Sequence, residues 1–471
     1  MKVARFMGNG FKILILCVLM LTLTTARGNC EEPKVLGLDE LIKLAVEHSP
    51  QLRQSDQQVL AAESDLMQAR GAMFPQLELV GTAGPVNDAD LPTVVVREEI
   101  APGVFSGVLQ DNDKNSVGIF GRLDVAIFQP LYAFGKISHR RDAAAFGVEA
   151  QRYGREARLS EVVLNVKELY YSMIVAQQGE GAARSAGDFI EDARNRIERL
   201  IDAQSPMVDQ SDLYRLEAFE ADIARFRARA ESGSRMAYHA LKRAIGYPEH
   251  KDFQLDRREL PMEAPRLQGL EEYVHMALES RPELKQLERG IEARKAMLKA
   301  SQADFYPTFF AAAIGSFAGA PGRERMPISY FGDDFNHARM GVIVGSEWKF
   351  DFGINRGRSR RALAEYQQLV HQKEFAADSI PLQVMRYYEE VLEAEKSLQA
   401  YRNAVVASRR WVVASFSDFD FGLGTARDMF DAIDRYGKNQ GEYLTLLLSY
   451  NISQARLEHA VGMYKGEVVS P

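Results

Sequence analysis

The sequence predicts a mainly α-helical protein with a small β part, in which a unit of helices, a strand pair and a long helical hairpin occurs twice. Three observations carry this prediction: an internal repeat, two stretches in which apolar and charged residues alternate, and helical segments of unusual length. Four strands per chain cannot close a cylinder, so we expect several chains to share a transmembrane β-barrel continued by a tube of helices.

The composition is that of a folded chain without transmembrane helices in its mature part. Hydrophobic residues make up 46% of the 471 residues and the mean hydropathy is −0.25, which excludes a polytopic helical membrane protein and also excludes disorder. A formal net charge of −7 argues against a nucleic-acid partner. No metal-ligand, nucleophile–base or phosphate-loop spacing occurs, so we expect no enzyme activity, cofactor or metal site.

Residues 1–28 have the organisation of a secretory signal peptide. Three basic residues, Lys2, Arg5 and Lys12, precede the apolar run 13–21, and small residues follow it. The apolar run is too short to span a membrane as a helix. Removal of this segment leaves Cys30 as the remaining cysteine, and the residues before it favour a free thiol over a lipidated one.

The repeat divides the mature chain into units at 29–265 and 266–471. Pro50 and its neighbours recur around Pro282, and Pro75 recurs as Pro307 at the same spacing. Each unit is predicted to open with a short helix and a longer one that begins at the first of these prolines. The second proline then ends the longer helix.

Strand pairs are predicted near 76–131 and 308–350. From Val117 to Gln129 apolar residues share one face while Arg122 and Asp124 lie on the other, and the stretch 340–351 repeats this alternation. Aromatic residues cluster at the strand ends, as at a membrane interface. The long loops 85–116 and 319–337 are predicted to face the exterior.

Long helical hairpins are predicted at 137–246 and 354–463. Their apolar residues recur in alternating steps of three and four, the spacing of coiled coils, and a helix of such length exceeds the needs of a globular domain. Since a barrel needs about eight strands, the chain must oligomerise, and three copies would supply 12. The sequence itself does not fix the copy number.

Carboxylates follow the turn of the second hairpin. Asp428 and Asp431 stand three residues apart on one helical face, and Asp434 continues the row. Around a symmetry axis such residues would form rings that favour cations and narrow a pore. The alternative is a solvated acidic first turn that suits the helix dipole, and both interpretations stay open on these grounds.

The whole mature chain resembles the TolC-like outer-membrane efflux protein family. The resemblance is carried by 270–284 and its earlier counterpart, by Phe134-Gly135 and Phe352-Gly353, and most specifically by 422–462. It implies a homotrimer with a 12-stranded barrel in outer-membrane lipid and an α-helical barrel in the periplasm. It also implies a channel, the exit duct of a tripartite efflux or type I secretion system, which docks with a periplasmic adaptor and an inner-membrane transporter.

By this resemblance Asp428 and Asp431 form the periplasmic gate, and the turn Gly422, Leu423, Gly424 and Thr425 contacts the adaptor. Three departures stand out. Phe421 replaces a tyrosine that could form a hydrogen-bonded latch, the first hairpin turn lacks the expected glycine, and Pro381 predicts a kink in the last long ascending helix. The competing hypothesis is a periplasmic coiled-coil scaffold or adhesin, which would need no polar channel lining.

Overall fold

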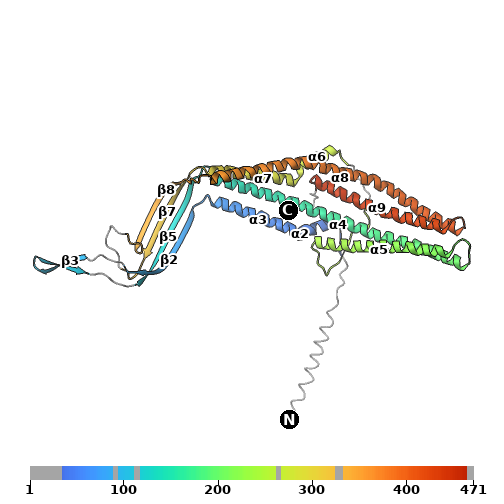
Figure 1. The fold of residues 1–471 in the computed structure, drawn as a ribbon, viewed down its shortest axis with the longest axis horizontal. Helices are drawn as coiled ribbons and strands as arrows, with labels where there is room; N and C mark the ends of the chain where they lie inside the picture. Colours follow the sequence, from blue (N-terminus) through green and yellow to red (C-terminus); the bar gives the residue numbers. More distant parts are fainter. Residues whose placement is uncertain (1–33, 89–93, 111–116, 261–266, 324–331, 464–471) are drawn as a thin grey trace, which may run out of the picture. The chain divides into compact units, whose positions relative to one another are not determined.

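The computed structural model describes residues 34–88, 94–110, 117–260, 267–323 and 332–463. The predicted signal peptide and Cys30 lie outside these ranges. The predicted class, mainly helical with a smaller strand component, is confirmed (Figure 1). None of the described helices has an apolar stretch long enough to cross a bilayer.

Each half of the chain contains a short helix, a longer helix, strands and then two long helices. The elements are β1 (Lys34–Leu36), α2 (Leu38–His48), α3 (Pro50–Gly71), β2 (Gln76–Asn87), β3 (Val94–Ala101), β4 (Val104–Gln110), β5 (Val117–Tyr132), α4 (Lys136–Asp202), α5 (Gln210–Ala244), β6 (Phe253–Leu255), α6 (Leu270–Ser280), α7 (Pro282–Ala303), β7 (Thr308–Gly319), β8 (His337–Glu347), α8 (Ile354–Asp420) and α9 (Ala426–Ala460).

These elements form two compact units. Unit 1 contains the described residues up to 48, 166–263 and 397–449, and unit 2 contains 49–165, 264–396 and those from 450 onward. The long helices α4, α8 and α9 contribute residues to both.

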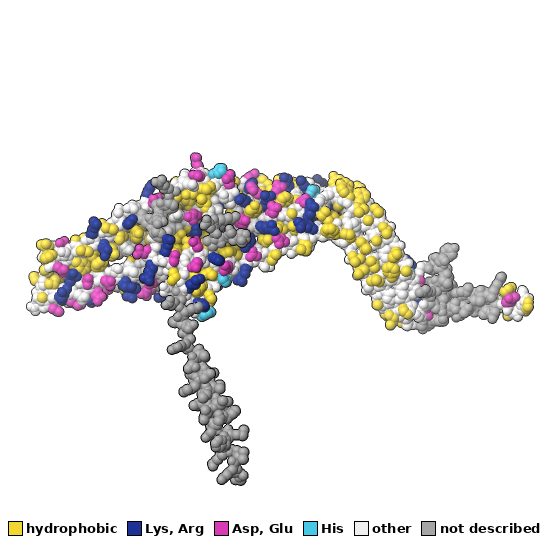
Figure 2. Space-filling model, turned by 180° about the vertical axis from the view of Figure 1, so that it is seen from behind, with side chains coloured by type: hydrophobic (Ala, Val, Ile, Leu, Met, Phe, Trp, Pro, Cys, Tyr) yellow, Lys and Arg dark blue, Asp and Glu magenta, His cyan; other side chains and the backbone are white. Residues whose placement is uncertain are grey.

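Unit 2 contains a four-stranded antiparallel sheet in the order β2-β5-β7-β8. The register pairs Leu79 with Val125 and Ala313 with Val342, and the residues on this face are mainly apolar and uncharged on all four strands. Val342 is 80% exposed, and Figure 2 shows hydrophobic side chains gathered over these strands. The opposite face carries the charged residues, among them Arg122 and Asp124, joined by an ion pair of 2.8 Å.

Two predictions about the strands need correction. The segment 85–116 is not a plain loop, because β2 continues to Asn87 and β3 and β4 form a hairpin with a turn at Pro102-Gly103. The strand predicted to include Trp348 and Phe350 ends earlier, at Glu347. The alternating pattern continues past the last ladder pair, which is why the sequence overestimates the strand.

Unit 1 is organised around the hairpins of α4 with α5 and α8 with α9. Its core lies next to their turns and contains Ile197, Leu216, Phe419, Met429 and Phe430, each no more than 2% exposed. The unit also contains a short parallel strand pair, β1 with β6, which was not predicted from the sequence. A parallel pair joins distant segments, so local periodicity cannot reveal it.

Candidate functional site

The turn between α8 and α9, residues 421–425, is the second turn. Leu423 N–H donates to Asp418 O at 2.8 Å and Gly422 N–H donates to Phe419 O at 3.0 Å, which is the Schellman arrangement at a helix end. It needs a left-handed residue, and Gly422 has φ +74°. Phe421 and Leu423 are left 78% and 82% exposed, so the predicted adaptor-contacting turn presents apolar side chains to its surroundings.

The turn between α4 and α5, residues 203–209, is the first turn, and it has the same helix ending. Ser205 N–H donates to Leu200 O and Gln204 N–H donates to Ile201 O, both at 2.9 Å. Gln204, with φ +53°, stands where the second turn has glycine. The two turns therefore differ in sequence but end their helices with the same backbone conformation and hydrogen bonds. They also meet, because a Cβ added to Gly422 would lie 3.6 Å from Met207 Cε.

The helices that follow the two turns, α5 and α9, both begin with a capping box. In α9, Thr425 N–H donates to the Asp428 carboxylate at 2.9 Å, and Asp428 N–H donates to Thr425 Oγ1 at 3.3 Å. In α5, Asp209 and Asp212 exchange the same pair of bonds. Aspartate serves at the third helical position in both, so the first turn of each helix is acidic.

The predicted row of three aspartates divides into three different environments. Asp428 accepts the Thr425 hydroxyl at 2.7 Å, and this bond together with the one from the Thr425 amide holds the pKa of Asp428 below its usual value. Asp434 pairs with Lys438 at 2.7 Å. Asp431 is exposed and has no hydrogen bond or ion pair among the described residues. The structure therefore shows an acidic first turn in which Asp428 caps the helix. The ring interpretation stays a prediction, for which Asp431 offers an exposed carboxylate.

The buried side of the first turns of α9 fixes the direction in which the aspartates point. Met429, Phe430 and Ile433 are buried in the core next to the turns, so Asp428 and Asp431 are kept on the exposed side. Within the first hairpin, Arg194 of α4 pairs with Glu220 of α5 at 2.6 Å. Between the hairpins, Arg196 of α4 pairs with Asp420 of α8 at 2.9 Å. The acidic face is therefore backed by a packed apolar core and by ion pairs between the helices.

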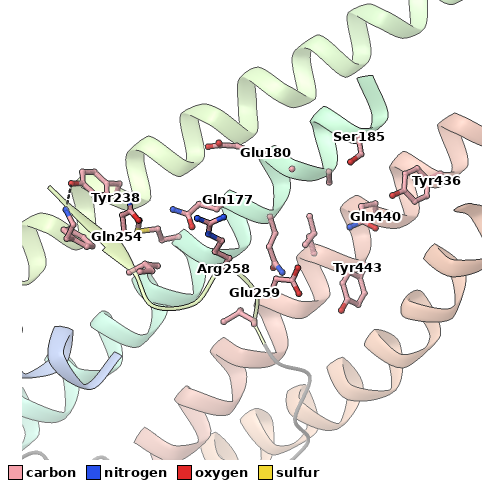
Figure 3. A pocket seen from close by; sticks show the side chains of 18 residues that line it. Gln177, Glu180, Ser185, Tyr238, Gln254, Arg258, Glu259, Tyr436, Gln440 and Tyr443 are labelled. Carbon is pink, nitrogen blue, oxygen red and sulfur yellow. Dashed lines mark hydrogen bonds between the residues drawn. The ribbon is translucent and has the colours of Figure 1, made fainter. Parts of the chain in front are cut away.

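Unit 1 also contains an open polar cavity of about 870 Å³ between α4, α5, the β6 segment and α9 (Figure 3). Tyr436, Gln440 and Tyr443 of α9 line it, and their spacing follows the alternating steps of four and three of a coiled coil. The buried Gln178 Oε1 there has no hydrogen-bond partner. Within the described ranges, no group of three His, Cys, Asp or Glu residues is arranged to hold a metal ion.

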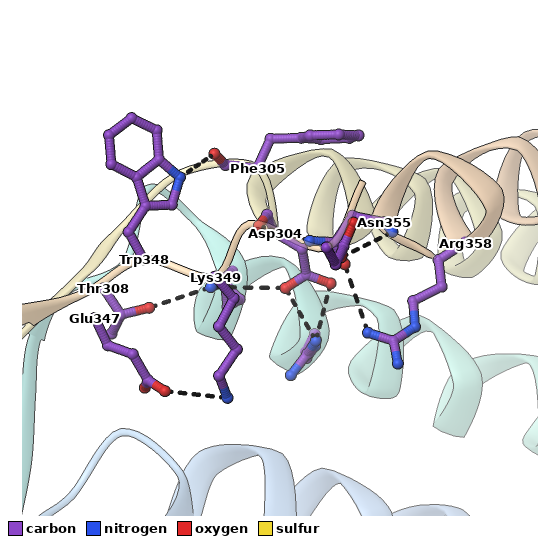
Figure 4. Close-up of polar contacts among 11 residues, drawn as sticks. Asp304, Phe305, Thr308, Glu347, Trp348, Lys349, Asn355 and Arg358 are labelled. Atoms are coloured by element: carbon purple, nitrogen blue, oxygen red, sulfur yellow. Dashed lines mark hydrogen bonds and ion pairs between the residues drawn. The ribbon is translucent and has the colours of Figure 1, made fainter. Parts of the chain in front are cut away.

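Where the strands of unit 2 meet the helices, Asp304 forms ion pairs with two basic side chains (Figure 4). Arg140 reaches its carboxylate at 3.3 Å and Lys136 at 3.7 Å, while the backbone oxygen of Asp304 accepts from Asn355 at 3.4 Å. Trp348 Nε1–H donates to Phe305 O at 3.0 Å. This polar junction was not predicted from the sequence, although basic residues follow each Phe-Gly pair closely.

Comparisons with known proteins identify a family and similar structures. The chain matches the family model described as outer membrane efflux protein over residues 41–203 and 273–463. No curated protein sequence matches it. Similar solved structures include the outer-membrane channel OprN (18% identity, TM-score 0.71, 90% of this chain and 89% of that one). The outer-membrane protein VceC of Vibrio cholerae (17%, 0.70, 90% and 96%) and the MtrE outer-membrane channel of Neisseria gonorrhoeae in its open state (17%, 0.72, 90% and 88%) are also similar.

These findings agree on one class, the outer-membrane channels that serve efflux, which are transport proteins rather than enzymes. The chain belongs to the outer membrane efflux protein family. Its function is that of an outer-membrane exit duct, and membership implies an oligomer that works with an adaptor and an inner-membrane pump.

Proposed function

We propose that three copies of the chain close one 12-stranded barrel in the outer membrane and continue it with a helical tube in the periplasm. The observation that carries the proposal is the sheet of unit 2. One of its faces is mainly apolar on all four strands, the other carries its charged residues, and β2 and β8 are edge strands with no further partner among the described residues. Open edges are not tolerated in lipid, and three sheets of four strands make an even-numbered barrel.

The assembled duct is a passive conduit. In this proposal residues 1–28 direct export, the repeats 29–265 and 266–471 each give two strands and one long hairpin, and the hairpin turns lie at the periplasmic end. The exposed second turn, with Gly422, Leu423, Gly424 and Thr425, contacts the adaptor. Apolar side chains such as Leu423, 82% exposed, suit such a contact.

The gate proposal rests on Asp428 and Asp431. Three copies bring three of each to one level, where like charges repel and attract cations. Asp431 is the stronger member, because its carboxylate is exposed and uncommitted, whereas Asp428 already accepts two bonds from Thr425.

The assembly is tested with the purified full chain in detergent. Light scattering should give about three times the mass of the mature protomer, and reconstitution into planar bilayers should give discrete conductance steps. A monomer that stays soluble without detergent and never conducts would overturn the proposal.

The gate is tested by replacing Asp428 and Asp431 together with alanine. Cation selectivity and block by multivalent cations should both fall, because the carboxylate rings are gone. Asp222→Ala, which removes an exposed carboxylate on α5, serves as the control and should leave selectivity unchanged. Equal selectivity in all three proteins would remove the gate assignment.

A further inference from the structure

The long helices that follow the sheet begin with basic residues. The segment Ile354–Arg361 at the start of α8 carries four arginines and no acid, and neither α4 nor α8 has an acidic residue in its first turn. Cations in a first turn oppose the helix dipole, and α5 and α9 follow the rule by beginning with Asp212 and Asp428. Arg361 pairs with Glu365 within the helix at 2.8 Å. Helix stability does not explain Arg356 and Arg360 in the same way.

The basic residues of α4 and α8 differ in how they are neutralised. At the start of α4, Lys136 and Arg140 share Asp304. On α8, Arg356 and Arg360 are exposed, and neither has an acidic partner among the described residues. They stand four residues apart, so they project from one side of the helix a single turn apart. Two uncompensated charges thus lie together at the start of α8.

Exposed aromatic residues come directly before these arginines. Trp348, Phe350 and Phe352 are 54%, 69% and 103% exposed. Phe352 also has φ +51°, a strained conformation for a residue with a Cβ. Its counterpart Phe134, at φ +49°, is stacked on Tyr306 with ring centroids 5.0 Å apart, so contacts account for the position of that ring. No such contact holds Phe352 among the described residues.

We propose that Arg356 and Arg360, with the exposed aromatic rings of Trp348, Phe350 and Phe352, form a binding surface for anionic phospholipid headgroups. We name it the α8 arginine surface. Arginine forks match phosphate oxygens, and aromatic rings with an apolar body favour the headgroup level of a bilayer. The apolar sheet face of the same unit lies on strands that end at this point. The two positive charges are complementary to the phosphate of an anionic lipid, in the leaflet that lies at the end of the sheet where α8 begins.

This inference rests on the proposed membrane placement of the sheet, and one experiment separates the two. The chain has two tryptophans, so Trp411→Phe leaves Trp348 as a single reporter beside the α8 arginine surface. The full protein is reconstituted in vesicles of phosphatidylcholine or phosphatidylglycerol with brominated acyl chains, which quench nearby tryptophan. The ratio of the two quenching curves gives the preference for the anionic lipid.

Trp348 should prefer phosphatidylglycerol, and Arg356→Gln with Arg360→Gln should lower that preference by about fivefold for each arginine. Arg409→Gln with Arg410→Gln removes the same charge from exposed positions further along α8 and should leave the preference intact. Oligomer mass checks that each variant assembles. Equal quenching by both lipids in every variant would overturn the headgroup surface alone, whereas no quenching by either lipid would overturn the membrane placement as well.

Discussion

Asp428 and Asp431 stand one helical turn apart but make different contacts. The first closes a capping box with Thr425, and the second has no partner among the described residues. Sequence spacing correctly places both on one exposed face, yet it could not assign the cap. That assignment depends on the backbone of Thr425, which only the helix start defines.

Asp428→Ala should lower the free energy of unfolding by about 1 kcal/mol at neutral pH, because α9 loses its cap. The pKa of Asp428 lies below its ordinary value, so its stabilisation is present above the unfolded-state value and is lost as pH falls through the folded-state value. The difference between the thermal midpoints of wild type and variant should therefore become smaller below about pH 4. Asp431→Ala is the control, and an identical difference for both variants would contradict the capping role.

Gln204 occupies a left-handed position that glycine adopts more readily. Gln204→Gly should raise the free energy of unfolding by about 0.5–1 kcal/mol, and Gly422→Ala, at the equivalent place in the second turn, should lower it by a similar amount. Denaturant unfolding of the two variants measures both effects. Destabilisation by Gln204→Gly would mean that the glutamine side chain has a role of its own in the first turn.

At the scale of elements, the alternation of apolar and polar residues was the most informative pattern. It placed Val117 and Val342 on outward faces of separate strands, and the register brings those faces together in one sheet. What it missed was the hairpin of β3 and β4. That segment contains turn-forming residues on all sides, which is equally typical of a loop.

The two sheet faces predict opposite tolerance to charge at neighbouring positions. Val342→Arg should prevent most of the chain from assembling in lipid vesicles, because arginine on the lipid side costs about 2–4 kcal/mol. Ile343→Arg, one residue further and on the other face, should assemble nearly as well as wild type. The fraction of detergent-resistant oligomer measures both, and equal losses would contradict the assignment of the faces.

Pro381 lies inside α8, which continues through it from Ile354 to Asp420. A proline in a helix interior removes one backbone hydrogen bond, so Pro381→Ala should stabilise the protein by up to about 3 kcal/mol and raise the thermal midpoint. Pro248→Ala, in the turn after α5, should change it little. The kink expected at Pro381 stays a prediction, and a lower midpoint for Pro381→Ala would argue that the bend is needed for assembly.

At the scale of the whole molecule, length and repetition fixed the class, because helices of 67 residues have few other uses than a tube or a coiled coil. The cavity lined by Tyr436, Gln440 and Tyr443 was beyond such reasoning. A heptad pattern reports which residues face inward but not whether a neighbour fills the space. Only the partners from α4, α5 and β6 reveal the gap.

The small parallel pair of β1 and β6 bears on how the chain acquires its fold. Lys34, the first described residue, pairs with Phe253, and Leu36 pairs with Leu255. A strand of three residues gains nothing until its distant mate exists, and closing so large a loop is entropically slow. β1 therefore stays unpaired until the chain as far as Leu255, more than half of its 471 residues, has been made and exported. Proteases that attack extended termini would find their best opportunity in that interval.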